Sequence, residues 1–235
     1  MAKLRFTGGP GLDLTINGDT MRAVGNESWN TGADRDGVYV FHRASRHMRV
    51  LANYLHDYGA PGSNTSQGIY HGSFVTSNTD IEIAYNRMVN QRGGRHIQLY
   101  GHLDGELTTD VRIHHNYLDT SPYYGVLLGR SDAPGGDIEW LEGVLVHNNT
   151  IRGNKVSCIH MNALGPRLMA KIYDNVCFAS GASSIVVTAG STGTTEIWNN
   201  CLDKTVTRQV SGASANVHDN RVDYPSCAAG RGAVP

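Results

Sequence analysis

The stretch VRIHHNYL, residues 111–118, alternates apolar and polar side chains and then reaches an asparagine, Asn116. Similar stretches, aligned on their asparagines, are MRVLANYL, IEIAYNRM, VLVHNNTI, AKIYDNVC, TEIWNNCL and ANVHDNRV, with Asn53, Asn86, Asn149, Asn175, Asn200 and Asn220. Successive asparagines are 33, 30, 33, 26, 25 and 20 residues apart. MRAVGNES, with Asn26, resembles a weaker eighth copy. A recurrence of this kind indicates a repeat protein.

Each copy has the period-two alternation of a β-strand. The residue three positions before the asparagine is aliphatic throughout: Val50, Ile83, Ile113, Val146, Ile172, Ile197 and Val217. The strand after the asparagine is expected to bury Leu55, Met88, Leu118, Ile151, Cys177, Leu202 and Val222. One more short strand precedes each long connection: GVYVF (37–41), QGIYHG (67–72), RHIQLYG (95–101), YGVLLGR (124–130), SCIHMN (157–162) and SSIVVTA (183–189). Each repeat therefore holds three short strands.

Three short strands cannot bury their own apolar face, but stacked repeats can, because each strand then pairs in parallel with its equivalents above and below. The pattern predicts an all-β parallel solenoid of about seven coils. The asparagine is expected at a tight corner, in αL backbone conformation, with its amide turned inward. Stacked about 4.8 Å apart, such amides can hydrogen-bond to one another and to corner backbone, forming a ladder.

The repeats and the asparagine ladder resemble the right-handed parallel β-helix, or pectin-lyase-like, superfamily. The resemblance covers roughly residues 20 to 224, inside a single domain of residues 1–235. Residues 1–20 are expected to form an N-terminal hairpin or cap, and residues 225–235 a C-terminal tail. The branch is not identifiable: the WIDH motif of pectate lyases, the DPHD-type motif of mannuronan epimerases and the paired aspartates of polygalacturonases are all missing. The fold alone does not dictate the chemistry.

Composition narrows the range of partners. Charged residues make up 17 % of the chain and the formal net charge is -1, so we expect neither nucleic acid nor membrane as a partner. Residues 1–11 have no apolar core of a secretory signal, yet we expect a secreted or extracellular protein. The four cysteines show no CxxC spacing, which argues against a zinc site. A disulfide between Cys201 and Cys227 stays open.

The resemblance places a binding cleft on the outer face of the strands equivalent to GVYVF (37–41). Alternation puts Tyr39, Tyr70, Gln98, Leu127, His160 and Val186 outward in one row. A second outward row contains Phe41, Gly72, Tyr100, Gly129, Asn162 and Thr188. The flanking turns add Arg95, His96, His102, Arg130 and Asp132. Tyrosine rings can stack on pyranose rings, and Arg95 or Arg130 can grip a carboxylate. The plainer alternative is that tyrosines simply suit β-strands.

The histidines supply the candidate acid–base groups. His96 and His102 bracket one strand, where either could act near neutral pH. Alternation points His71 inward, beside Val40 and Leu99, which favours a core role, although a bulge at Gly72 could turn it outward. His114 and His147 would be neighbours in an outer stack, but aromatic stacking explains that column without a metal, and we assign no metal ligands. Carboxylates in the turns leave Ca²⁺ as the one optional cofactor.

These residues favour a polysaccharide lyase-like enzyme. β-Elimination on a uronate polysaccharide needs a base and a positive group, which Arg95 with His71, His96 or His102 could supply. Tyr39, Tyr70, Gln98, Tyr100, Arg130 and His160 would bind the polysaccharide. The alternative is a non-catalytic glycan-binding or tailspike-like module that uses the same rings and cations. Because no clear cap precedes the first coil, an uncapped coil end could also pair with a second copy of the chain.

Overall fold

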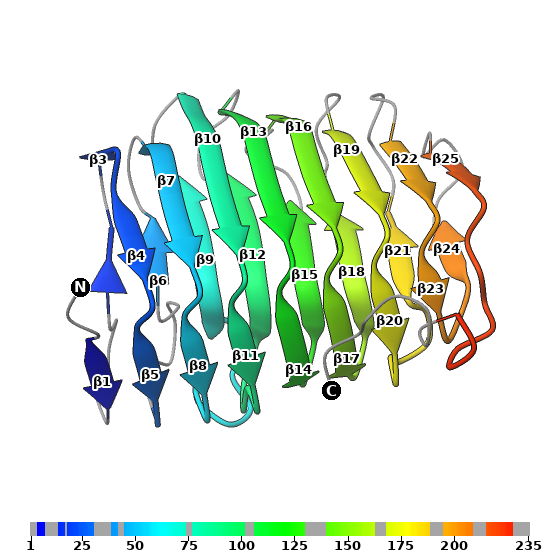
Figure 1. Ribbon diagram of the computed structural model, residues 1–235, viewed down its shortest axis with the longest axis horizontal. Coiled ribbons are helices and arrows are strands. Elements are labelled where there is room, and N and C mark those ends of the chain that lie inside the picture. Colours follow the sequence, from blue (N-terminus) through cyan, green and yellow to red (C-terminus); the bar gives the residue numbers. More distant parts are fainter. Residues whose placement is uncertain are drawn as a thin grey trace.

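The computed structural model describes residues 4–7, 14–16, 18–30, 39–41, 45–73, 77–101, 106–129, 140–162, 168–188, 195–208 and 215–227. Every regular element within these ranges is a strand. The strands form three parallel sheets that run side by side along the long axis of the molecule, with the coils stacked in chain order (Figure 1). The predicted parallel solenoid is confirmed. None of the described segments is a helix long and apolar enough to cross a membrane.

The three sheets are named A, B and C. Sheet A consists of β1 (Arg5–Thr7), β5 (Glu27–Trp29), β8 (Tyr54–His56), β11 (Arg87–Val89), β14 (Tyr117–Ser121), β17 (Thr150–Asn154), β20 (Val176–Phe178) and β23 (Cys201–Leu202). Sheet B consists of β2 (Leu14–Thr15), β6 (Tyr39–Phe41), β9 (Gln67–Ser73), β12 (Arg95–Gly101), β15 (Tyr124–Gly129), β18 (Ser157–Asn162), β21 (Ile185–Val187) and β24 (Val206–Arg208). Sheet C consists of β3 (Gly18–Asp19), β7 (Ser45–Leu51), β10 (Ser77–Ala84), β13 (Leu107–His114), β16 (Trp140–His147), β19 (Leu168–Tyr173), β22 (Thr195–Trp198) and β25 (Ala215–His218), and β4 (Arg22–Val24) also pairs with β7.

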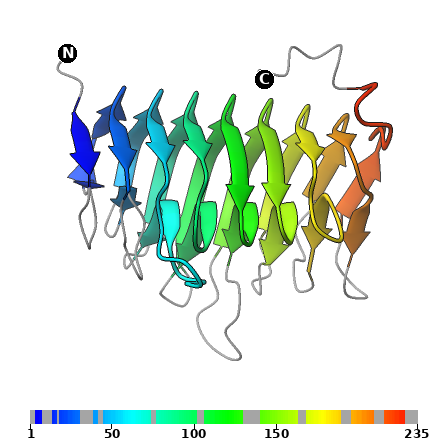
Figure 2. The ribbon, with the colours of Figure 1, turned by 90° about the horizontal axis from the view of Figure 1, so that it is seen from below.

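The core is one continuous column of apolar side chains between the sheets. Figure 2, seen from below, shows the coils stacked side by side along the length of the molecule. From Val50 to Ile197, the residues three before each asparagine are fully buried, as predicted, and so are the residues from Leu55 to Leu202 on sheet A. The last coil differs, because Val222 is 50 % exposed. The prediction that it is buried is wrong, since no further described coil stacks over it.

The asparagine ladder is confirmed, and it includes Asn26. In each link the backbone N–H and the Nδ2 of one asparagine donate to Oδ1 of the asparagine in the next coil, over 2.8–3.2 Å. Nδ2 also reaches the carbonyl of the residue three before the preceding ladder asparagine, as from Asn116 to Ile83, 2.9 Å. The sheets hold eight or nine described strands, so the expected count of about seven coils is slightly low.

The corner conformation differs from the prediction. The αL residue is not the ladder asparagine but the residue before it, with φ between 51° and 70°: Gly25, Ala52, Tyr85, His115, Asn148, Asp174, Asn199 and Asp219. The preceding residue makes the turn, which leaves the asparagine free to direct its amide into the solenoid. Because αL costs about 1–2 kcal/mol for residues with a Cβ, this corner carries strain wherever it is not glycine.

Replacing Ala52, an exposed alanine at φ 55°, by glycine is therefore expected to stabilise the protein by about 0.5–1 kcal/mol. Urea unfolding of the two proteins measures the difference. Ala84, at the end of β10 in the next coil, is buried and is not among the αL residues. Ala84→Gly should destabilise instead, and a stabilising effect there would contradict the explanation from backbone strain.

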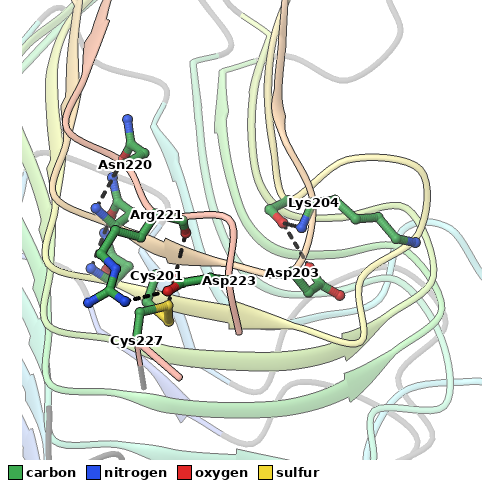
Figure 3. The surroundings of a disulfide bond; sticks show 10 residues. Cys201, Asp203, Lys204, Asn220, Arg221, Asp223 and Cys227 are labelled. Carbon is green, nitrogen blue, oxygen red and sulfur yellow. Dashed lines mark hydrogen bonds and ion pairs between the residues drawn. A yellow bond between two sulfur atoms is a disulfide. The ribbon is translucent and has the colours of Figure 1, made fainter. Parts of the chain in front are cut away.

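The C-terminal end of sheet A is covered by residues 221–227. The disulfide that the sequence left open is formed, between Cys201 in β23 and Cys227 (Figure 3). The amide of Leu202 donates to the carbonyl of Arg221 over 2.8 Å, and the Tyr224 ring stacks on Phe178 at 4.5 Å. The edge of β23 is therefore paired and covalently closed.

Candidate functional site

The first outward row of sheet B has the predicted members from β9 onward. The register aligns Tyr70 with Gln98, Gln98 with Leu127, Leu127 with His160, and His160 with Val186. Tyr39 is the exception: it pairs with Ile69, and Val40 takes the position beside Tyr70. The assignment of Tyr39 to this row is wrong, because a one-residue shift in register moves every side chain to the other face. Its backbone alone is described.

The row is not open to solvent, contrary to expectation. Tyr70, Gln98 and His160 are only 7 %, 3 % and 8 % exposed. The side chains of this face cover one another. A Cβ on Gly72 would lie 2.4 Å from Cε1 of Tyr70, which shows that the Tyr70 ring lies over the glycine of its own strand. A ring can take this position only because residue 72 has no side chain.

Arg95 lies at the centre of this face, at the start of β12, and is 5 % exposed. Its guanidinium donates to Oε1 of Gln98 over 2.8 Å, and Nε2 of Gln67 donates to the same oxygen over 2.9 Å. The rings of Tyr123 and Tyr124 lie 5.9 and 5.7 Å from the guanidinium carbon. The Arg95 guanidinium is thus hydrogen-bonded to the side-chain amide of Gln98 and lies beneath the half-buried rings of Tyr123 and Tyr124.

His160 joins the same cluster from β18. Its ring centroid lies 4.6 Å from that of Tyr124, at an angle of 42°. Burial, and to a smaller extent the charge of Arg95, lower the pKa of His160 to about 4. Its Nδ1 is buried without a hydrogen-bond partner in the structure as described. At neutral pH the imidazole is therefore uncharged and beside an arginine.

The remaining rings of the face are Tyr70 and Tyr100, whose centroids are 6.3 Å apart with planes tilted by 33°. Tyr100 is half-buried and reaches solvent, as do Tyr123 and Tyr124. The structure thus brings together Tyr70, Gln98, Tyr100, Arg95 and His160 from the predicted set. His102 and Arg130 lie outside the described residues.

Two predicted catalytic histidines lie inside the solenoid. His71 is 1 % exposed and aligned with Leu99, as alternation indicates, although its other neighbour in register is Phe41 rather than Val40. His96 is fully buried and hydrogen-bonds through Nδ1 to the hydroxyl of Tyr58, and burial lowers its pKa to about 3. The expectation of a surface base at His96 is wrong, because the corner before β12 turns both His96 and Ile97 into the core.

Sequence reasoning missed Gln67, Tyr123 and Tyr124. Gln67 aligns with Arg95, and Tyr124 aligns with Ser157, so these residues form a further row three residues before the first. Period-two alternation gave no signal for Tyr124, because it precedes the inward Val126 by two residues and is therefore expected to point inward. The corner before the strand instead brings its ring against His160 and Arg95.

The aromatic side chains of sheet C are arranged differently. His114, His147, Tyr173, Trp198 and His218 form a continuous column with centroids 4.6–6.1 Å apart and planes within 14° of parallel. Within such a column each ring covers the face of the next, so mainly ring edges meet solvent. The rings of sheet B are tilted by 33° to 50° and do not cover one another's faces in this way.

Metal-binding groups are sparse in the part of the chain that is described. It contains no group of three or more histidine, cysteine or acidic side chains arranged to hold a metal ion. Most of the turn carboxylates considered for Ca²⁺, including Asp34, Asp36, Asp104, Asp132 and Asp137, lie outside the described residues. Glu106 is described and is buried.

No family model and no curated protein matches the chain. Among solved structures, the chain is similar to endopolygalacturonase I from Stereum purpureum, described in complex with two galacturonate molecules. The identity is 14 %, the alignment covers 93 % of this chain and 94 % of that chain, and the TM-score is 0.39. A likeness at this level carries no functional argument, so the site stands on its own geometry.

Proposed function

We propose that this protein binds an acidic polysaccharide along the outer face of sheet B. The observation that carries the proposal is the cluster of tilted tyrosine rings around Arg95. Sugar rings stack on aromatic faces, and the rings of Tyr70 and Tyr100, and of Tyr123 and Tyr124, are tilted relative to each other rather than stacked face to face. The coplanar column of sheet C offers edges instead.

Arg95 supplies selectivity for a negative charge. In the structure its guanidinium bonds the neutral carbonyl oxygen of Gln98. A uronate carboxylate that takes this position would form a bidentate ion pair with Arg95. Its charge-assisted hydrogen bonds are about twice as strong as neutral ones. The amides of Gln67 and Gln98 would then be released toward sugar hydroxyl groups. The ligand class is therefore a pyranose polymer that carries carboxylates.

Tyr100→Ala is expected to weaken binding about tenfold, the equivalent of about 1.4 kcal/mol, because it removes a half-buried ring of the face. Calorimetry with polygalacturonate, alginate and hyaluronate, against uncharged dextran, gives the affinities. Tyr173→Ala is the matched control, since it removes a ring of the coplanar column and should leave affinity unchanged. Unchanged affinity in Tyr100→Ala, or no preference for acidic polymers, would overturn the proposal.

A second candidate, β-elimination, is favoured by one observation: His160, whose imidazole is uncharged at neutral pH, and the guanidinium of Arg95 both contact the ring of Tyr124. In this reaction His160 takes the proton at C5 of a uronate, a double bond forms between C4 and C5, and the C4–O bond breaks. The released O4 oxygen takes a proton from water and leaves as the hydroxyl group of the other sugar. Arg95 stabilises the negative charge that develops on the carboxylate. Because the Tyr124 ring covers His160, that ring must move when substrate binds.

The absorbance of unsaturated chain ends separates the two candidates. We expect it to rise when the protein is incubated with a cleavable uronate polymer, with and without Ca²⁺, and His160→Ala should abolish the signal without abolishing binding. Binding without any unsaturated product identifies the protein as a glycan-binding module. Product formed at the same rate by His160→Ala would exclude His160 as the base.

A further inference from the structure

We propose that His114 and His115 form a binding site for a divalent copper ion at the corner between sheets C and A. The Nδ1 atoms of these consecutive residues lie 2.8 Å apart, and the planes of the two rings are 86° apart. His114 is at the end of β13, and His115 is the exposed αL residue of the corner, with φ 52°. The site is independent of the proposed function on sheet B.

A carboxylate prepares His114 as a ligand. Nε2 of His114 lies 3.0 Å from Oε1 of Glu82, one coil earlier. The carboxylate accepts the Nε2 proton, which fixes the tautomer and leaves a lone pair on Nδ1. Glu82 is itself held by Arg49, 3.1 Å away. A histidine oriented in this way by a carboxylate is a recurring arrangement around protein-bound metals.

His115 completes the pair. Since Nδ1 of His114 has no proton, Nδ1 of His115 carries one and donates it in a hydrogen bond to Nδ1 of His114 in the metal-free state. When a metal binds, the proton of His115 passes through solvent to its own Nε2, and both Nδ1 lone pairs face the ion. The pKa values of both histidines lie below their ordinary value, chiefly because of burial. Protons therefore compete little with a metal at neutral pH.

The spacing favours copper over zinc. For metal–nitrogen bonds of about 2.0 Å, two neighbouring ligands of a square-planar ion have nitrogen atoms about 2.8 Å apart, whereas tetrahedral ligands are about 3.3 Å apart. In the metal-free pair the two nitrogen atoms are joined by a hydrogen bond of 2.8 Å, so they need to move less to reach the square-planar spacing than the tetrahedral one. Divalent copper prefers this geometry and also binds nitrogen ligands more tightly than zinc. Water would fill the remaining positions.

The neighbouring histidine in the column does not share the site. The rings of His114 and His147 are stacked, 5.0 Å apart and 11° from parallel, so their nitrogen atoms do not converge through the stack. Nδ1 of His147 hydrogen-bonds to Oδ1 of Asn148 over 2.7 Å instead. His147→Ala is therefore the matched control variant, because it removes an imidazole from the column without removing a proposed ligand.

The test is titration of tag-free protein with Cu²⁺ and with Zn²⁺, followed by calorimetry and by electron paramagnetic resonance of the copper signal. We expect one tight Cu²⁺ per chain with two nitrogen ligands in the plane, and Zn²⁺ at least tenfold weaker. His115→Asn should lose at least tenfold in Cu²⁺ affinity. This variant keeps the corner, because Asn148 and Asn199 occupy the equivalent αL position in other coils.

Two more variants sharpen the result. Glu82→Ala should weaken Cu²⁺ binding 10- to 100-fold through loss of the fixed tautomer. His147→Ala should leave it unchanged. Equal Cu²⁺ affinity of the parent and of His115→Asn, or a copper signal with a single nitrogen ligand, would show that the two imidazoles share only a hydrogen bond and would overturn the proposal.

Discussion

Asn116→Ala is expected to lower the free energy of unfolding by about 3–5 kcal/mol. Oδ1 of Asn116 accepts two hydrogen bonds of 3.0 Å, from the backbone N–H and from Nδ2 of Asn86. Nδ2 of Asn116 donates to Ile83 and Asn149 in the two adjoining coils. All of these groups are buried, so alanine would leave at least two donors without a partner, each costing about 1–3 kcal/mol.

Urea unfolding measured by circular dichroism gives the value. Asn220→Ala is the matched control at the end of the ladder, where Oδ1 also accepts two hydrogen bonds from the preceding asparagine. Asn220 is only half-buried, so water can replace what is lost there, and we expect a cost of about 1 kcal/mol. Equal costs at the two positions would show that burial of the amides is not what makes the ladder stabilising.

Removing the disulfide with Cys227→Ser is expected to cost about 2–4 kcal/mol, mainly because the unfolded chain loses a cross-link that spans 26 residues. The C-terminal coil should be the first part of the protein to unfold. Without the bond, residues 221–227 are still held by backbone hydrogen bonds to Asn200 and Leu202 and by the stacking of Tyr224 on Phe178.

Unfolding with and without a reducing agent tests this. Reduction should destabilise the parent by the same amount and leave the stability of Cys227→Ser unchanged. Amide exchange at Leu202, which bonds to Arg221, should be faster in the reduced parent and in Cys227→Ser than in the oxidised parent. A parent whose stability does not respond to reduction would exclude a stabilising disulfide.

Most of the fold could be predicted because the asparagine fixes the phase of every repeat. Once Asn116 and its equivalents are aligned, the buried positions of sheets A and C follow by counting residues, and even the weak copy at Asn26 proves to be part of the ladder. Sheet B has no such marker. The strand at residues 37–41 alternates equally well in either phase, which explains the shift at Tyr39.

The site was harder to predict, for two physical reasons. Alternation says which side of a strand a residue faces, but it does not locate the corner that turns His96 inward. It also says nothing about how side chains of neighbouring coils lie over one another. Tyr70 is buried over Gly72, and Arg95 lies beneath Tyr123 and Tyr124. Such contacts join residues from different repeats, and pattern reasoning within one repeat does not contain them.

The asparagine-to-asparagine bonds of the ladder have a direction: from Asn26 to Asn200, each asparagine donates to the next one toward the C-terminal end. One coil therefore offers its successor the same hydrogen-bonding edge that it receives from its predecessor. A duplicated coil could therefore hydrogen-bond to the coils on both sides of it. The intervals of 20 to 33 residues between asparagines show that the connecting segments can differ in length while the corner stays the same. Each coil added by gene duplication would lengthen the outer face of sheet B by about 4.8 Å.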